Sequence, residues 1–189
     1  MKSNRVLGLS VIWLLIGINL AVFMITLADQ SLVYSLGFQP ASFLHRPWTI
    51  LTSLFVHAGV GHIIVNMISL FFFGSYLARL VGERNLLIVY FAGGILGNIF
   101  YLFLGPAYST AVGASGAIFA LGGALAVMTP RLKVLVFPIP VPLPLWIAVI
   151  GVFLILSLIP QVAWQAHLGG LILGLIAGYY FKRRGPYLV

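Results

Sequence analysis

Long apolar stretches, separated by short polar connections, constrain the fold of this chain more than any other feature. A helix that crosses a bilayer needs about 20 apolar residues. Six stretches approach or exceed this length, and they are residues 6–27, 61–80, 85–105, 114–129, 142–159 and 165–181. With 62% hydrophobic and 6% charged residues, the 189-residue chain cannot bury its apolar surface as a soluble domain. We predict an all-α polytopic membrane protein, a single domain over residues 1–189 with six transmembrane helices.

The connection between the first two predicted spans, residues 28–60, is too polar and too often interrupted to cross a bilayer. Gly37, Pro40 and Pro47 break it, and it is rich in aromatic residues such as Trp48. Aromatic side chains are enriched where a membrane meets water. We therefore expect this connection at the outer interface, with its histidines as ordinary interfacial polar residues.

The positions of the basic residues predict the orientation of the spans. With the N-terminus inside, every one of the ten Lys and Arg residues except Arg46 falls on the cytoplasmic side. Cytoplasmic connections of membrane proteins carry such an excess of Lys and Arg. Both termini are therefore expected in the cytoplasm, and the net charge of +8 is attributed to topology rather than to nucleic-acid binding. A plain core of six helices is expected in a prokaryotic plasma membrane.

Four polar residues on three predicted spans lie at one depth. Counted from the cytoplasmic basic residues at 1.5 Å per residue, Ser115, His167, His62 and Asn66 lie about 20–25 Å above the inner boundary. Polar side chains inside a bilayer are costly unless they are paired or face water, and they commonly mark functional sites. The sequence therefore predicts a site a few ångströms below the outer face of the hydrocarbon core.

The other residue types limit the chemistry available at this level. The chain has no cysteine, and its two carboxylates, Asp29 and Glu83, fall on opposite sides of the predicted membrane. This excludes the paired carboxylates of an aspartyl protease, and the sequence has no His-Glu-x-x-His zinc motif. No metal is expected. A Ser115–His167 dyad remains, with His167 as the general base that activates the Ser115 hydroxyl.

An acyl-transfer site also needs donors for a developing oxyanion. The backbone N–H of Ser115 lies near a helix start, where amides lack an intrahelical acceptor. His62 and Asn66 are four residues apart and share one helix face, so both side chains are further candidates. Each has an alternative role, because an intramembrane Asn often links helices and a His at a helix start often lies in the interface.

Three motifs connect these residues to a known family. Gly113-Ala114-Ser115-Gly116 matches a G-x-S-G nucleophile motif, and His62-x-x-x-Asn66 matches an H-x-x-x-N motif. The third match is Ala166-His167-x-x-Gly170-x-x-x-Gly174, to the pattern A-H-x-x-G-x-x-x-G. With these motifs in this order on these spans, the sequence resembles the rhomboid family of intramembrane serine proteases, most clearly over residues 45–181.

The resemblance implies a six-helix core in the lipid bilayer that hydrolyses peptide bonds of transmembrane-helix protein substrates without a cofactor. It implies Ser115 as nucleophile, His167 as base, and an oxyanion hole made by His62, Asn66 and the Ser115 N–H. The fifth span is the expected lateral gate for substrate. A cavity open to the outside is expected above Ser115, covered by the first connection and residues 161–165.

Two positions depart from the family pattern. Relatives often have Trp-Arg in the first connection, whereas Thr49 follows Trp48 here and the arginine, Arg46, comes earlier. Relatives often have tyrosine at the position of Phe119, whose phenyl ring can pack on the His167 imidazole but cannot donate a hydrogen bond.

Packing and two alternative functions complete the prediction. Gly170, Gly174 and Gly178 form a stripe of small residues on the sixth span, which favours close packing against the fourth span. One alternative is a catalytically inactive relative that acts as a membrane chaperone or degradation factor, although such relatives typically lose the serine or the histidine. The other is a transporter or channel, which predicts charged or carboxylate residues along a pathway and internal repeats, and neither is evident.

Overall fold

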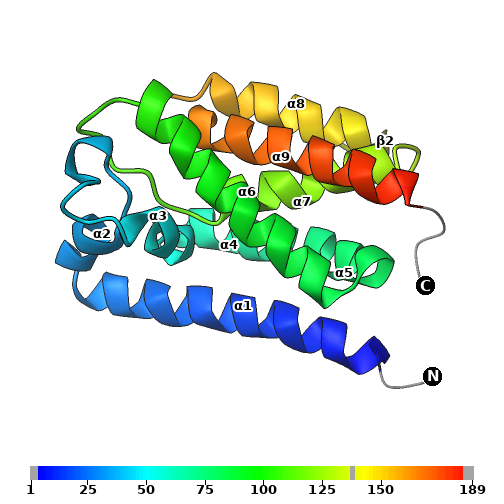
Figure 1. Cartoon of the computed structure of the whole chain (residues 1–189), viewed down its shortest axis with the longest axis horizontal. Coiled ribbons are helices and arrows are strands. Elements are labelled where there is room, and N and C mark those ends of the chain that lie inside the picture. The colour runs from blue at the N-terminus through cyan, green and yellow to red at the C-terminus, as the bar shows by residue number, and fades with distance from the viewer. Residues whose placement is uncertain (1–3, 137–138, 185–189) are drawn as a thin grey trace.

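The computed structural model describes residues 4–136 and 139–184 of the chain (Figure 1). Residues 1–3, 137–138 and 185–189, which the predicted domain 1–189 includes, lie outside the described part. The described residues form mainly helices. Their longest ones are α1 (Asn4–Ala28), α6 (Glu83–Leu104), α7 (Ser115–Met128), α8 (Leu145–Ser157) and α9 (Trp164–Arg183).

Three described segments are long and apolar enough to cross a membrane: Val11–Ala28 within α1, Val60–Val81, and α6. The helices α7 and α8 are apolar but shorter, and α9 is 20 residues long with Gln165 and His167 in its first turn. Helix α1 begins and α9 ends at the same end of the molecule (Figure 1). The chain is a multi-pass membrane protein built from a bundle of helices.

The second predicted span is not a continuous α-helix. It consists of α4 (Val60–Ser69), a five-residue π-helical segment η3 (Leu70–Gly74) and α5 (Ser75–Val81). Helix α1 passes close to the end of η3, because a Cβ on Gly74 would lie 2.6 Å from Cδ1 of Ile12. Single π-helical turns are rare and occur mostly as interruptions of α-helices. An apolar stretch gives no sign of such a turn, because its hydropathy is the same in either helix.

The expectation of an all-α fold also missed a short hairpin between α7 and α8. Strands β1 (Lys133–Val134) and β2 (Leu143–Pro144) pair antiparallel, with Lys133 opposite Pro144. A proline cannot donate to a ladder and is tolerated at its edge. The hairpin leads directly into α8 and lies away from the polar residues predicted to form the site.

The first connection is folded back on itself by side-chain hydrogen bonds. Its elements are α2 (Ser31–Leu36), the 3-10 helices η1 (Pro40–Ser42) and η2 (Ser53–Phe55), and α3 (Thr49–Thr52). The last carbonyls of a helix lack intrahelical partners. In α2 these carbonyls accept from side chains of the same connection. The Tyr34 carbonyl accepts from Arg46 Nη1 (2.6 Å), the Ser35 carbonyl from Trp48 Nε1 (3.2 Å) and the Leu36 carbonyl from Thr52 Oγ1 (2.7 Å).

Arg46 and Thr49, which depart from the family pattern, both serve this connection. Arg46 makes one of the bonds to α2. Thr49 is buried, and its Oγ1 donates to the Arg46 carbonyl at 2.6 Å. The arginine therefore anchors the connection from its earlier position in the sequence.

Helix α7 forms the centre of the bundle. Of its 14 residues, all except Ser115 and Val127 are buried. The glycine stripe of α9 lies against its backbone, since Cβ atoms on Gly170, Gly174 and Gly178 would meet the carbonyl oxygens of Gly116, Ala120 and Ala124. Small residues on both helices thus let α7 and α9 approach closely, as the stripe predicted.

Candidate active site

Ser115 is the first residue of α7, and the turn before it is shaped by Gly113. This glycine has φ +122°, a conformation that side chains of L-residues rarely adopt. Its N–H donates to the Ser53 carbonyl at 2.9 Å, which ties the turn to the first connection. A Cβ on Gly113 would also lie 2.7 Å from Cε1 and 2.8 Å from Nε2 of His62. Both backbone conformation and space therefore require glycine beside the serine.

His167 lies in the first turn of α9 and meets Ser115 across the interface of α7 and α9. The distance from His167 Nε2 to Ser115 Oγ is 2.8 Å. Gly170 and Gly116 make this approach possible, because a Cβ on Gly170 would overlap the Gly116 carbonyl. The histidine is 5% exposed, so the hydrogen bond is largely shielded from solvent.

No carboxylate orients the His167 ring among the described residues. Its Nδ1 is buried without a hydrogen-bond partner there. Asp29 lies exposed after the end of α1, where its carboxylate accepts from the Ser31 hydroxyl (2.7 Å) and N–H (2.9 Å), and these bonds lower the pKa of Asp29. Glu83 begins α6. About 22 Å of helix separate it from Asn98, the residue of α6 that lines a cavity beside Ser115. The site contains a pair rather than a triad.

Phe119 packs against the His167 ring. It lies one turn after Ser115 on α7, and its ring centroid is 4.7 Å from that of His167, with 33° between the planes. Its other neighbour is Phe153 of α8, at 6.0 Å and nearly perpendicular. Aromatic rings in such contact restrict one another's orientation. The packing expected of Phe119 on His167 is confirmed.

His62 lies in the first turn of α4 with its ring against Gly113. Its Nδ1 accepts from the Ala58 N–H at 3.5 Å, so the ring hydrogen is assigned to Nε2. Nε2 is one of the atoms that a Gly113 Cβ would touch. A hydrogen-bond donor therefore faces the turn that carries Ser115.

Asn66 lies one turn further along α4 and is buried at 5% exposure. Its Nδ2 donates to the His62 carbonyl at 2.8 Å, a bond within the same helix. The described hydrogen bonds of this residue include none to Ser115 or His167. Its contribution to an oxyanion hole stays a prediction.

His57 is a residue whose surroundings were wrongly predicted. It was expected to be an interfacial polar residue, but it is 2% exposed and its ring centroid is 5.1 Å from that of His62. Nδ1 lies 3.3 Å from the Phe55 carbonyl. Burial lowers the pKa of His57 to about 4, and the neighbouring His62 acts in the same direction. Its spacing of five residues before His62 gave no helical signal of this contact.

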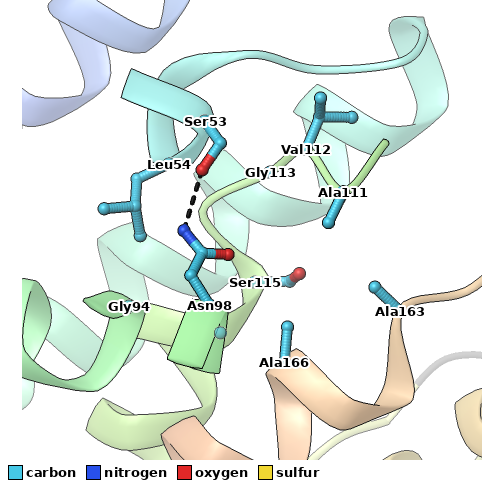
Figure 2. A pocket seen from close by; sticks show the side chains of 11 residues that line it. Ser53, Leu54, Gly94, Asn98, Ala111, Val112, Gly113, Ser115, Ala163 and Ala166 are labelled. Carbon is cyan, nitrogen blue, oxygen red and sulfur yellow. Dashed lines mark hydrogen bonds between the residues drawn. The ribbon is translucent and has the colours of Figure 1, made fainter. Parts of the chain in front are cut away.

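A small cavity beside Ser115 reveals two further residues that were not predicted. Its free volume of about 20 Å³ is enough for one water molecule. Figure 2 shows Ser53 of η2 and Asn98 of α6 on one side of it and Ala163 and Ala166 on the other. Both polar residues are buried. A single Asn in an apolar stretch was no stronger a signal than several others in this chain.

A larger hollow of about 310 Å³ has one lining residue, Ala163, in common with this cavity. It is bordered by Pro106 and Ser109, after α6, and by residues 157–165 between α8 and α9. The predicted cover, residues 161–165, lies along its wall, and Gln161 in it has φ 69°. In the part of the chain that the structure describes, no group of three or more His, Cys, Asp or Glu side chains could hold a metal ion.

The helical bundle and the Ser115–His167 contact define a class, a multi-pass membrane protein with a Ser–His pair at the first turns of two neighbouring helices. The family model for the Rhomboid domain matches residues 44–184. The chain belongs to the rhomboid family.

Three curated relatives show how far the similarity extends. "Rhomboid protein 1, mitochondrial" of Saccharomyces cerevisiae is 28% identical over 195 residues, covering 92% of this chain and 54% of the relative. "RHOMBOID-like protein 1" of Arabidopsis thaliana is 33% identical over 144 residues (76% and 36%), and "Inactive RHOMBOID-like protein 8" of the same plant is 39% identical over 82 residues (43% and 23%). The chain spans about half of the length of the yeast relative, and less of the other two.

Proposed function

We propose that this chain is a serine endopeptidase of the membrane, which hydrolyses a peptide bond in or near transmembrane helices of other proteins. The observation that carries the proposal is the 2.8 Å contact between Ser115 Oγ and His167 Nε2. A hydroxyl in hydrogen-bond reach of an imidazole is the arrangement of an activated nucleophile. Membership of the rhomboid family supports the same reaction.

The proposed acylation step uses the Ser115 hydroxyl and the His167 imidazole. As Ser115 Oγ bonds to the scissile carbonyl carbon, its proton passes to His167 Nε2 and the carbonyl oxygen becomes an oxyanion. The proposed donors to that oxygen are the Ser115 N–H, the His62 Nε2–H and the Asn66 side chain. When the C–N bond breaks, His167 returns the proton to the leaving nitrogen, which leaves an ester on Ser115.

Deacylation needs one water molecule on the shielded side of the site. The cavity bordered by Ser53 and Asn98 has room for it next to Ser115. His167 Nε2 takes a proton from the water as its oxygen attacks the ester carbon. The bond from carbon to Ser115 Oγ then breaks, and the serine recovers its proton from His167.

The proposal includes a topology and a location. Six helices cross the bilayer, both termini face the cytoplasm, and the site opens to the outside through the hollow along residues 157–165. Support comes from the basic residues, because in this topology Arg46 alone lies on the outer side and the other nine Lys and Arg residues lie on the cytoplasmic side. The proposed location is a prokaryotic plasma membrane, with α8 as the lateral gate for substrate.

Proteolysis of a transmembrane-helix substrate by purified protein in lipid tests the function. Wild type is expected to cleave a substrate with helix-destabilising residues near its outer end, and Ser115→Ala and His167→Ala are expected to lose cleavage. Ser35→Ala removes an exposed hydroxyl that bonds within α2 to the Ser31 carbonyl and lines neither cavity, so it is the matched control and should cleave normally. Persistent cleavage by Ser115→Ala would refute the dyad. An intact wild type that cleaves none of several substrates would favour an inactive relative with a chaperone or degradation role.

A further inference from the structure

We propose that Asn98 is a positioning residue, which aligns the nucleophile turn through the first connection. The inference rests on the proposed function for its catalytic consequence, but its structural link is independent of that function. Asn98 lies on α6, and it touches neither Ser115 nor His167 by any described hydrogen bond. It acts through Ser53 and Gly113.

The first step is the contact of Asn98 with the connection. The residue is 6% exposed, and its Nδ2 donates to the Ile50 carbonyl and to Ser53 Oγ, each at 2.8 Å. Figure 2 shows the second of these bonds across the cavity wall. Both hydrogens of one amide group are thus used on residues 50–53, more than 40 positions earlier in the chain. A buried amide that lost these acceptors would be left unsatisfied.

The second step runs from Ser53 to the turn before α7. The Ser53 carbonyl accepts from the Gly113 N–H at 2.9 Å, and Ser53 is 2% exposed. Gly113 holds φ +122°, and because glycine has the least restricted backbone, contacts with its surroundings have to fix this conformation. The bond to Ser53 supplies that constraint on one side, because it fixes the direction of the Gly113 amide.

The third step joins the turn to the catalytic groups. The position of a Gly113 Cβ would be 2.8 Å from His62 Nε2 and 3.6 Å from Ser115 Oγ. A shift of this turn therefore changes the distance between the nucleophile and the donor proposed for the oxyanion. Displacements of about 1 Å at such a site cost about 100-fold in rate. The link from α6 thus reaches Gly113 in two bonds, from the Asn98 side chain to Ser53 Oγ and from the Gly113 N–H to the Ser53 carbonyl.

The test compares Asn98→Leu with Asn19→Leu. Both asparagines are buried in apolar helices and donate to carbonyls, but Asn19 bonds to Leu15 within α1. Four quantities are measured below the unfolding temperature of each variant: kcat and KM for a transmembrane substrate, the rate at which a fluorophosphonate labels Ser115, and the rate of hydrogen exchange at the Gly113 amide.

We expect Asn98→Leu to lower kcat and the labelling rate by about tenfold or more, with KM within about twofold, and to speed exchange at Gly113. Asn19→Leu should change none of these beyond about twofold, even where it lowers thermal stability. Ser53→Ala should show a smaller loss, and the double variant with Asn98→Leu should be no worse than Asn98→Leu alone, because both act on one link.

Three results would overturn the inference. Normal labelling with slow turnover would assign Asn98 to water supply in deacylation rather than to alignment. Unchanged exchange at Gly113 would break the structural link. Equal losses in Asn98→Leu and Asn19→Leu would indicate general destabilisation. If wild type neither cleaves nor is labelled, the proposed function fails, and the exchange experiment alone still decides whether Asn98 holds the turn.

Discussion

Helices α7 and α8 are neighbours of similar length with opposite kinds of packing. All but two of the 14 residues of α7 are buried, whereas the buried residues of the 13-residue α8 are Leu145, Ala148 and Val149. All three lie in the first half of α8. Its second half, which leads to the hollow along residues 157–165, contributes no buried residue, and Leu154 is 57% exposed.

The difference distinguishes two kinds of helix packing in this molecule. Helices α7 and α9 pack backbone against backbone, whereas α8 packs through its side chains. Gly170, Gly174 and Gly178 place α9 against carbonyl groups of α7, so the two helices cannot separate or slide without a large rearrangement. Around Gly151 of α8, by contrast, there is open space for a Cβ. The Ser115–His167 pair lies in the first kind of interface, and the proposed gate belongs to the second.

A single methyl group added to a glycine in each kind of interface tests the difference most directly. Gly170→Ala drives a Cβ into the Gly116 carbonyl, and we expect it to destabilise the fold by about 1–3 kcal/mol and to abolish most activity, because α7 and α9 must separate. Gly151→Ala should be neutral or stabilising by up to about 1 kcal/mol, since alanine has the higher helix propensity. Thermal unfolding in detergent and substrate cleavage measure both. Equal effects of the two substitutions would contradict the distinction.

The turn at the start of α7 should be nearly as sensitive. Gly113→Ala places a side chain at φ +122° and against the His62 ring, at a cost of about 1–3 kcal/mol. We expect a loss of cleavage by one to two orders of magnitude, about 10–100-fold, with a smaller loss of stability. Gly59→Ala, with open space around its Cβ and φ 175°, is the control and should remain active. Full activity of Gly113→Ala would show that the turn is not constrained as described.

Phe119 connects the two regions, because it contacts His167 of α9 and Phe153 of α8, and its substitution should lower activity by an intermediate amount. Phe119→Leu removes the ring that packs on His167, and we expect kcat to fall about tenfold, through a freer imidazole. Phe153→Leu removes only the outer neighbour of Phe119 and should change kcat by less than about threefold, with a loss of about 0.5–1.5 kcal/mol in stability. Steady-state kinetics in lipid separate these effects. A larger effect of Phe153→Leu would mean that α8 positions the dyad.

The smallest expected effect is a dependence of stability on pH, which comes from His57 in the first connection. Helix α8 has no titratable side chain, while His57 is buried beside His62, and burial lowers the pKa of His57 from its ordinary value of 6.5 to about 4. Between these values the unfolded chain binds the extra proton. The stability contributed by neutral His57 is therefore complete above about pH 6.5 and declines as the pH falls toward 4.

Thermal unfolding of wild type and His57→Gln over this pH range checks the effect. The difference between the two midpoints should change as the pH falls, because the other titratable groups are common to both proteins. His45→Gln, at an exposed position of the same connection, should follow wild type. Parallel curves for wild type and His57→Gln would refute the assignment.

The sequence by itself determined the class, the approximate helices and the residues of the pair. Long apolar stretches indicate transmembrane helices because a bilayer offers backbone N–H and C=O groups no hydrogen-bond partner outside the protein, and a helix pairs them within the segment. Ser115 and His167 were predicted as a pair because the chain offers few other groups for hydrolysis at that depth. The glycine stripe was likewise evident from its spacing on one helix face.

Tertiary structure alone decided how these parts are aligned. The burial of His57, the anchoring of the connection by Arg46 and the path from Asn98 through Ser53 to Gly113 join residues up to 60 positions apart (Ser53 and Gly113). The π-helical turn in the second span and the bond of Asn66 within its own helix also had no sequence signal. Periodicity records which face of a helix is apolar, but a hydrogen bond between distant segments depends on where the folded chain brings them together.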